Sequence, residues 1–344
     1  MTKTLTVNAT HPDPATILEA AQVIGRGGLV AFPTETVYGL GANGLSAAAV
    51  QRIFAAKQRP SSDPLILHVS STEDFQLVAV LDGLEELVST LAARFMPGAL
   101  TLVLPKQARV PLEVTAGGQS VAVRVPNHAV ALALIAASGV PIAAPSANLF
   151  SRPSPTTAAA VLEDLAGRID AVLDSGETQI GVESTVLSLI GAPTLLRPGG
   201  VPLEEIEALI GEVLLLGEAV LSERVAQPAP GMLLKHYSPR AKLLLVAYGA
   251  DLERRVKSAA RGVRGRLGLL LPSDSLAWLS GVSAERFDLG ATHQQIASRL
   301  FAGMRALDAA GCDAILTHQL EGTGLGRALN DRLFRAASGN VIQG

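Results

Sequence analysis

Short aliphatic segments alternate with longer amphipathic segments along most of the chain, and few folds accommodate that order. In residues 241–344 the alternation of strand-like with helix-like segments is typical of a parallel, doubly wound sheet. Hydrophobic residues make up 48% of the 344-residue chain and aromatic residues only 3%, so aliphatic side chains must build the core. Such cores are typical of sheets covered by helices. We therefore expect an α/β protein.

The length of the chain predicts two domains. We expect a first domain over residues 1–221, a Pro- and Gly-rich linker over 222–240 and a second domain over 241–344. Expected strands of the first domain are 28–32, 65–69, 100–104, 120–125, 141–144, 171–174 and 184–189. Its expected helices are 14–26, 46–57, 84–95, 129–137, 157–165 and one that begins at Leu203. The second domain is expected to contain strands 242–247, 267–271, 286–289 and 314–317, and helices 252–260, 293–309 and 325–337.

Charge and cysteine content exclude several classes of protein. A formal net charge of −3 and a sequence pI near 6.1 provide no overall basic field that would gather nucleic acid. Cys312 is the only cysteine, which excludes an internal disulfide framework and a multi-cysteine zinc site. The N-terminus lacks the pattern of a signal peptide, and no stretch is apolar enough to span a bilayer. We expect a cytoplasmic protein without membrane contact.

Gly39, Gly41 and Gly44 spell the G-x-G-x-x-G pattern of dinucleotide-binding sites. That pattern requires a strand that runs directly into the first glycine. Here Pro33 and six further residues separate the expected strand from Gly39, and Asp63 precedes the next strand instead of ending it. We therefore interpret the glycines as a loop that lets the chain turn, and a NAD enzyme remains the less favoured alternative.

The Lys57–Arg59 pair and the single residue Arg124 each allow two interpretations. Lys57 and Arg59 follow a predicted helix, so they either stabilise its dipole or bind phosphate, with the arginine as a bidentate fork. Arg124 shares one face of a predicted strand with Ser120 and Ala122. That face is either solvated or places Arg124 against a carboxylate.

Polar motifs also stand at the ends of predicted strands. Residues 145–148 (PSAN) place a hydroxyl and an amide in a loop that suits phosphate or ribose. Residues 181–185 (GVEST) open a strand with three polar side chains, and Arg197 precedes flexible glycines that can approach a ligand closely. Residues 322–326 (GTGLG) precede a helix in the second domain, where they form either a packing turn or an anion site.

Together these motifs resemble the threonylcarbamoyl-adenylate synthases, in their longer two-domain form. The resemblance covers the whole chain and is strongest in segments 33–41 (PTETVYGLG), 57–59 with 64–68 (PLILH), 97–101 (PGALT), 121–126 (VAVRVP), 145–148, 181–185 and 196–199 (LRPG). It implies an N-terminal twisted open α/β sheet and a smaller, Rossmann-like C-terminal domain. A related carbamoyl-transfer module occurs in hydrogenase-maturation proteins beside cysteine-rich zinc fingers, and the single cysteine argues against that class.

The family forms threonylcarbamoyl-AMP and pyrophosphate from L-threonine, bicarbonate and ATP, with Mg²⁺, in the first step of the t6A modification of tRNA. The resemblance implies that Lys57 and Arg59 are the catalytic residues. It assigns ATP to Lys57, Arg59, Asp63, Ser120, Ser146, Asn148, Ser154, Arg197 and Tyr237. It assigns L-threonine to Thr36, His68, Arg124, Ala144 and Ser184. The linker that carries Tyr237 becomes a candidate lid.

Two positions depart from the family pattern, since Asp63 stands where Asn is common and Ser120 where Thr is common. The chain lacks a Ser-His-Asp or paired-carboxylate constellation, so positioning and charge neutralisation are expected to dominate catalysis. Downstream partners are expected to be the transferases that complete t6A. The near-neutral charge leaves direct tRNA binding undecided, and an RNA-binding protein without catalysis is the remaining alternative.

Overall fold

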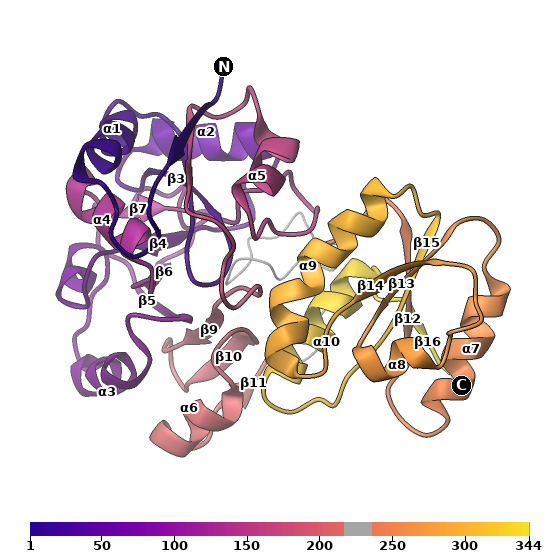
Figure 1. Cartoon of the computed structure of the whole chain (residues 1–344). Helices are drawn as coiled ribbons and strands as arrows, with labels where there is room; N and C mark the ends of the chain where they lie inside the picture. Colours follow the sequence, from indigo (N-terminus) through magenta and orange to yellow (C-terminus); the bar gives the residue numbers. More distant parts are fainter. Residues whose placement is uncertain (217–235, 344) are drawn as a thin grey trace.

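The computed structural model of the protein describes residues 1–216 and 236–343. Residues 1–216, called the N-terminal domain here, contain an eleven-stranded mixed sheet with the order β1-β8-β2-β3-β7-β4-β6-β5-β9-β10-β11 (Figure 1). Its strands are β1 (Lys3–Thr6), β2 (Val30–Phe32), β3 (Gly39–Asn43), β4 (Ile66–His68), β5 (Leu100–Pro105), β6 (Ser120–Arg124), β7 (Ile142–Ala143), β8 (Ala171–Asp174), β9 (Thr185–Ser188), β10 (Thr194–Arg197) and β11 (Leu214–Leu215). Its helices are α1 (Pro14–Gly25), α2 (Ala47–Lys57), α3 (Glu85–Phe95), α4 (Ala129–Ser138), α5 (Ala158–Leu165) and α6 (Leu203–Ile210), with a short 3-10 helix at Glu73–Leu77.

Helices cover both faces of this sheet, so one aliphatic core lies on each side of it. Alternate residues of a strand point to opposite faces. Ala31 of β2 joins the core beneath α2, whereas Val30 and Phe32 join the core beneath α1 and α4. The prediction of an α/β fold with aliphatic cores is confirmed.

The glycine-rich stretch is a strand and not the loop that the sequence suggested. Gly39–Asn43 form β3, which pairs antiparallel with β2. A Cβ on Gly41 would lie 2.8 Å from side-chain atoms of Phe32 and Ile142, so close packing between neighbouring elements requires a residue without a side chain. Because β3 begins at the first glycine instead of ending there, the segment is not the strand-turn-helix of a dinucleotide site.

Residues 236–343 carry the C-terminal domain, a five-stranded parallel sheet with the order β14-β13-β15-β12-β16. Helices α9 and α10 pack on one face and α7 and α8 on the other, as predicted for a doubly wound sheet. The strands are β12 (Lys242–Val246), β13 (Leu267–Leu271), β14 (Glu285–Asp288), β15 (Ala314–His318) and β16 (Val341–Ile342). The helices are α7 (Leu252–Gly262), α8 (Ser273–Ala277), α9 (His293–Ala309) and α10 (Leu325–Ala336).

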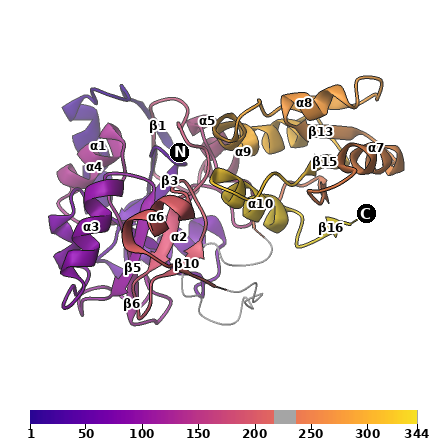
Figure 2. The same cartoon turned by 90° about the horizontal axis from the view of Figure 1, so that it is seen from below.

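Helices α9 and α10 face the N-terminal domain in both views (Figures 1 and 2). Val37 and Val182 of the N-terminal domain belong to the same apolar cluster as Phe301 of α9 and Leu333 of α10. At Gly181 a Cβ would lie 2.3 Å from the carbonyl oxygen of residue 297 in α9. The two domains therefore share a continuous buried contact, and α9 and α10 lie directly behind the 181–185 motif.

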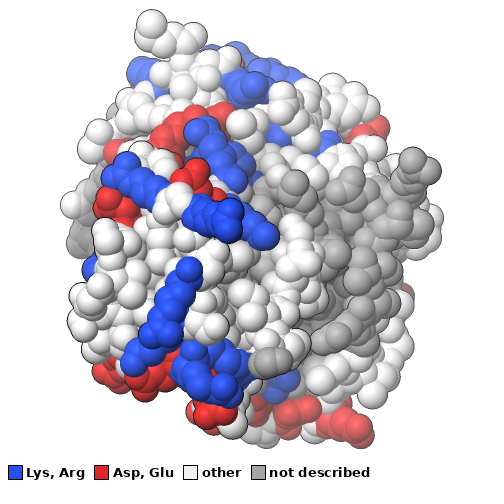
Figure 3. Space-filling model, turned by 90° about the vertical axis from the view of Figure 1, so that its right-hand side faces the viewer, with Lys and Arg blue, Asp and Glu red and all other residues white. Residues whose placement is uncertain are grey.

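Charged side chains of both signs are interspersed on the outer side of the C-terminal domain (Figure 3). Arg254 lies 2.9 Å from Asp251, and Arg266 lies 2.6 Å from Glu285. This surface therefore agrees with the weak overall charge of the chain. Among the described residues, no helix is both long and apolar enough to cross a membrane.

Residues 217–221, the end of the predicted first domain, lie outside the described residues. The same holds for residues 222–235 of the predicted linker, 222–240. The 322–326 turn leads into α10, and a Cβ on Gly326 would lie 1.9 Å from the carbonyl oxygen of Glu321. This glycine is thus required for packing.

Candidate functional site

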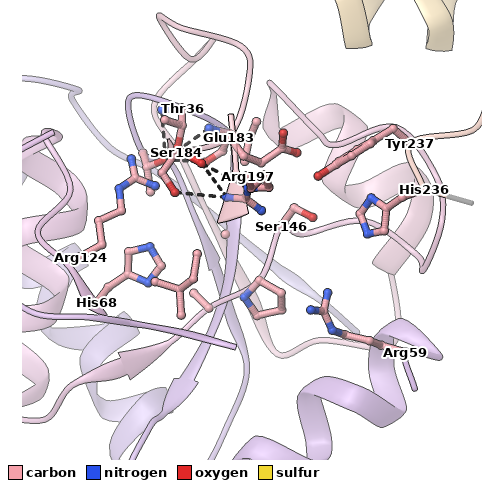
Figure 4. Close-up of a pocket in the computed structure, with 16 residues that line it drawn as sticks. Thr36, Arg59, His68, Arg124, Ser146, Glu183, Ser184, Arg197, His236 and Tyr237 are labelled. Carbon is pink, nitrogen blue, oxygen red and sulfur yellow. Dashed lines mark hydrogen bonds between the residues drawn. The ribbon is translucent and has the colours of Figure 1, made fainter. Parts of the chain in front are cut away.

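A cavity opens where the ends of β2, β4, β6, β7 and β10 meet the segment around residue 236. Its described lining comes from elements that are far apart in the sequence (Figure 4). The lining residues are Thr34, Thr36, Val37, Gly39, Arg59, Ile66, His68, Arg124, Ala144, Pro145, Ser146, Glu183, Ser184, Arg197, His236 and Tyr237. Six of the seven segments that carry the family resemblance thus meet in one place, all but 97–101, together with His236 and Tyr237 from the end of the predicted linker.

Arg124 and His68 lie at one end of the cavity, on the neighbouring strands β6 and β4 (Figure 4). Arg124 is only 3% exposed, so a solvated face for its strand is excluded. Its Nε donates to the carbonyl of Gly98 at 3.0 Å, and its Nη2 lies 2.7 Å from Oε1 of Glu35. This ion pair lacks hydrogen-bond geometry, because Nη2 and both Glu35 oxygens have no hydrogen-bond partner within the described residues. The guanidinium is therefore held in place with a donor left for a ligand.

His68 is buried beside Arg124 and is uncharged at neutral pH. Burial lowers the pKa of His68 to about 3, and the positive charge of Arg124 adds to the shift. The ring packs edge-on against Phe32, and Nδ1 has no hydrogen-bond partner among the residues that the structure describes. A neutral imidazole with one free nitrogen can orient a small polar ligand without competing for its carboxylate.

Hydroxyl groups line the cavity next to this end. The hydroxyl of Thr34 donates to the carbonyl of Val37 at 2.7 Å and lies 2.8 Å from the hydroxyl of Thr36. Ser184 Oγ lies 2.8 Å from the hydroxyl of Thr101 and accepts a hydrogen bond from Arg197 at 3.2 Å. Side-chain hydrogen bonds thus fix the turn between β2 and β3 and the start of β9.

Arg59 and Tyr237 lie at the opposite end of the cavity (Figure 4). Gln58 caps the C-terminal end of α2 in the left-handed conformation, with φ 55°, and this turn directs Arg59 into the site. Arg59 donates to the carbonyl of Pro64 at 2.9 Å and pairs with Asp63 at 2.9 Å. Its pKa is lowered by burial and raised by Asp63, yet a guanidinium stays charged in proteins.

Arg197 lies between the two ends. Its Nη2 and Nε donate to the carbonyl of Ser184 at 2.9 and 3.2 Å. The side chain is 4% exposed, and burial lowers its pKa. The cavity therefore contains three buried arginines, which is the charge pattern of a site for anions.

Nine of the fourteen predicted site residues line the cavity, and the other five do not. Lys57 is 1% exposed and donates to the carbonyls of Ser146 and Asn148 at 2.5 and 2.6 Å. Burial, followed by the charge of Arg59, lowers the pKa of Lys57 well below its usual value. Lys57 thus supports the 145–148 loop from behind in this structure.

Three other predicted residues also lie directly behind the lining. Asp63 pairs with Arg59, and Ser154 donates to Oε1 of Glu183 at 2.5 Å. Asn148 donates to the carbonyls of Leu149 and Arg152, and its Oδ1 has no partner within the described ranges. Ser120 begins β6, opposite Pro105 and four residues before Arg124, and does not line the cavity.

Glu183 and His236 line the cavity but were not assigned roles from the sequence. Glu183 is the acidic residue of the 181–185 motif, and that motif was the available signal. His236 precedes Tyr237, and nothing in its sequence context marks it. Burial and then the charge of Arg59 lower the pKa of His236 well below its usual value, so this histidine is neutral too.

Comparisons with known proteins place the chain in a family. Residues 22–199 match a family model described as "Telomere recombination" (Sua5, YciO and YrdC), and residues 201–338 match the model for the C-terminal domain of threonylcarbamoyl-AMP synthase. The threonylcarbamoyl-AMP synthase of Pyrococcus abyssi is 46% identical over 94% of both chains, and that of Bacillus subtilis is 43% identical over 95% of this chain and 94% of the relative. The chain belongs to the threonylcarbamoyl-AMP synthase family.

A solved structure of the family agrees with both domains. The P. abyssi protein Sua5, crystallised with L-threonine, superposes with a TM-score of 0.91 at 44% identity and over 100% of both chains. The resemblance inferred from the motifs is therefore confirmed, and with it the two-domain α/β architecture of this family.

Proposed function

We propose that this protein is an L-threonylcarbamoyladenylate synthase, a nucleotidyltransferase that forms threonylcarbamoyl-AMP and pyrophosphate from L-threonine, bicarbonate and ATP. This reaction is the first step of t6A formation in tRNA. The observation that carries the proposal is one cavity with Arg124 beside a neutral His68 at one end and Arg59 at the other. Membership of the family and the L-threonine complex of the P. abyssi relative support it.

The end of the cavity around Arg124 suits an amino acid. Arg124 would bind the carboxylate of threonine through its free donor, next to the charge of Glu35. The hydroxyls of Thr36 and Ser184, the backbone of Ala144 and the neutral ring of His68 would hold the hydroxyl and the amine. A protonated His68 would repel the amine, and its lowered pKa prevents this at neutral pH.

The other end suits the nucleotide. Arg59 and Arg197 would face the phosphates, Ser146 and Asn148 would hold phosphate or ribose, and Tyr237 would cover the nucleotide. Asp63 and Ser154 act on ATP through Arg59 and Glu183 in this arrangement, since neither lines the cavity. Ser120 stays a prediction without a contact to the site.

Lys57 and Arg59 stay the proposed catalytic pair. Arg59 would neutralise the charge that develops on the leaving pyrophosphate. Lys57 holds two carbonyls of the 145–148 loop, so it would position that loop until a phosphate competes for its ammonium group.

Mg²⁺ would accompany ATP and be held by phosphate oxygens and water. The described residues contain no cluster of three or more acidic, histidine or cysteine side chains that could hold a metal. Both oxygens of Glu183 already accept hydrogen bonds. The chain thus suits a metal that arrives with its nucleotide.

The chemistry requires positioning more than acid-base groups. The amine of threonine attacks the carbon of bicarbonate, a C–N bond forms, and water leaves. A carbamate oxygen then attacks the α-phosphorus as the bond to pyrophosphate breaks. Carbamates decompose readily in water, and a buried cavity protects the intermediate.

Pyrophosphate release tests this proposal. The protein is incubated with ATP, Mg²⁺ and bicarbonate, and release is compared with threonine, with serine and without an amino acid. We expect threonine to stimulate release and serine to do so weakly or not at all. Release that is independent of threonine would defeat the proposal.

The proposed reaction supplies the transferases that complete t6A, and the cytoplasmic location stays a prediction. Salt-dependent RNA retention without turnover of ATP would revive the RNA-binding alternative.

A further inference from the structure

Arg332 of α10 is a fully buried arginine of the C-terminal domain, and its contacts cross to the N-terminal domain. Its exposed fraction is 0%. Nε donates to Oε2 of Glu183 at 2.7 Å, and Nη2 donates to the carbonyl of Pro198 at 3.1 Å. Both acceptors belong to segments that carry the cavity wall. Burying the charge of an arginine costs desolvation free energy, so the groups that pair with Arg332 indicate what the buried charge does.

Glu183 is the only acidic side chain among the described residues that line the cavity. It is 6% exposed and its Oε1 accepts a hydrogen bond from Ser154. Burial alone would raise its pKa, but Arg332 and then Arg197 hold it below the usual value. Glu183 is therefore a buried anion in the wall of a site for which we propose an anionic nucleotide.

A carboxylate at this place would repel a triphosphate unless a neighbouring cation neutralises it. Arg59 and Arg124 are already paired with Asp63 and Glu35. Among the described residues, Arg332 is the cation that forms an ion pair with Glu183, and it comes from the other domain. On its own helix, Arg332 also forms an ion pair with Asp331, whose carboxylate lies 2.5 Å from Nη1.

Tyr237, another residue of the cavity wall, also contacts Arg332. The guanidinium of Arg332 lies over its ring, 5.1 Å from the centroid, and Phe301 of α9 stacks on it at 5.4 Å. The backbone of Tyr237 is in the left-handed region, with φ 61°, which a non-glycine residue adopts only when its surroundings hold it there. Two helices of the C-terminal domain thus hold one wall residue and neutralise another.

We propose that Arg332 is a positioning residue through which the C-terminal domain makes the nucleotide end of the cavity competent to bind ATP, by neutralising Glu183. This inference rests on the proposed function, because it assigns the nucleotide to this end. It gives the C-terminal domain a role within the reaction instead of a separate activity.

Charge variants at the pair test the proposal. Arg332→Gln removes the ion pair of Glu183, and we expect the KM for ATP to rise about 30-fold or more, with the KM for threonine changed less than about threefold. Arg332→Lys keeps the charge and should cost less than about fivefold. In the double variant with Glu183→Gln the KM for ATP should return to within about fivefold of Glu183→Gln alone, because no anion is left to neutralise.

Arg327→Gln is the matched control. Arg327 lies on the same helix and also crosses the domain boundary, where it pairs with Glu204 at 3.1 Å, but both side chains are partly exposed and neither lines the cavity. This variant should change the KM for ATP less than about twofold. An effect as large as that of Arg332→Gln would show that any weakened domain contact suffices, and would overturn the proposal.

The remaining outcomes are also decisive. If Arg332→Gln does not fold, the double variant decides: a KM for ATP more than about tenfold above that of Glu183→Gln overturns the proposal, since Arg332 would then act independently of Glu183. Equal rises in the KM values for ATP and threonine in Arg332→Gln overturn it as well. A wild-type protein without threonine-dependent pyrophosphate release would instead defeat the proposed function. Equilibrium binding of a non-hydrolysable ATP analogue to the wild type and Arg332→Gln then tests the nucleotide site by itself.

Discussion

The two ends of the cavity differ in which part of the chain builds them. The end with Arg124 and His68 is formed by neighbouring strands of one sheet, and the contacts of Arg124 stay within the N-terminal domain. At the other end Tyr237 stacks on Phe301, and Glu183 pairs with Arg332, both from the C-terminal domain. The comparison indicates that the proposed amino-acid end is complete in a single domain, whereas the proposed nucleotide end needs two.

The amino-acid end should show the largest effect of a single substitution. Arg124→Lys loses the planar fork that binds a carboxylate. We expect the KM for threonine to rise about 100-fold or more while the KM for ATP changes little. Steady-state pyrophosphate release with each substrate varied in turn measures both constants.

Arg94→Lys is the control for this variant, because Arg94 pairs with Glu205 on the surface at 3.1 Å. It should leave both constants unchanged. Equal rises for threonine and ATP in Arg124→Lys would contradict a separate amino-acid end.

A substitution at the proposed nucleotide end should affect the kinetic constants for ATP more than those for threonine. Arg59→Lys removes one of the two guanidinium groups that we propose face the phosphates, together with the donor to the carbonyl of Pro64. We expect kcat/KM for ATP to fall about 30-fold with a much smaller change in the KM for threonine. Competition between ATP and a non-hydrolysable analogue separates binding from turnover. A loss confined to threonine would reverse the assignment of the two ends.

The smallest expected effect is on the pH dependence of stability. His68 has a pKa of about 3 in the folded protein against an ordinary value of 6.5, so the unfolded chain binds its proton first as the pH falls. The contribution of neutral His68 to the free energy of unfolding is fully present above pH 6.5 and decreases below it, by about 1.4 kcal/mol at pH 5.5. His68→Gln should remove that part of the decline.

Urea unfolding of both proteins at pH 8 and pH 5.5 measures the difference, and the values at pH 8 give the effect of the substitution itself. His236 also has a lowered pKa and contributes its own slope, which His68→Gln leaves in place. An identical decline in both proteins would show that His68 is not a buried neutral base.

The sequence predicted the residues that line the end with Arg124 better than those that line the end with Arg59, for a physical reason. Thr36, His68, Arg124 and Ser184 stand beside strands whose alternation and order along the chain bring them to one edge of a sheet. The contact between α10 and Glu183 depends on how two domains dock. An arginine in an amphipathic helix such as Arg332 looks like a solvated residue until the docking is known.

Strand β3 shows a second limit of prediction. Glycines are rare in strand interiors and common in loops, so the sequence predicts a loop at Gly39–Asn43. The structure requires glycine at position 41 because the side chains of Phe32 and Ile142 pack closely against it, and this packing comes from tertiary structure. The burial of Lys57 behind the 145–148 loop has the same origin, since the sequence suggested that Lys57 and Arg59 either stabilise the helix dipole or bind phosphate.

Isotope transfer into the product tests the central claim most directly. The protein is incubated with ¹³C-bicarbonate, ATP, Mg²⁺ and L-threonine, and the mixture is analysed at once by mass spectrometry. The account predicts an adenylate that contains threonine and one ¹³C carbon, formed in equal amount to pyrophosphate. Pyrophosphate or ADP without a labelled threonyl adenylate would contradict it.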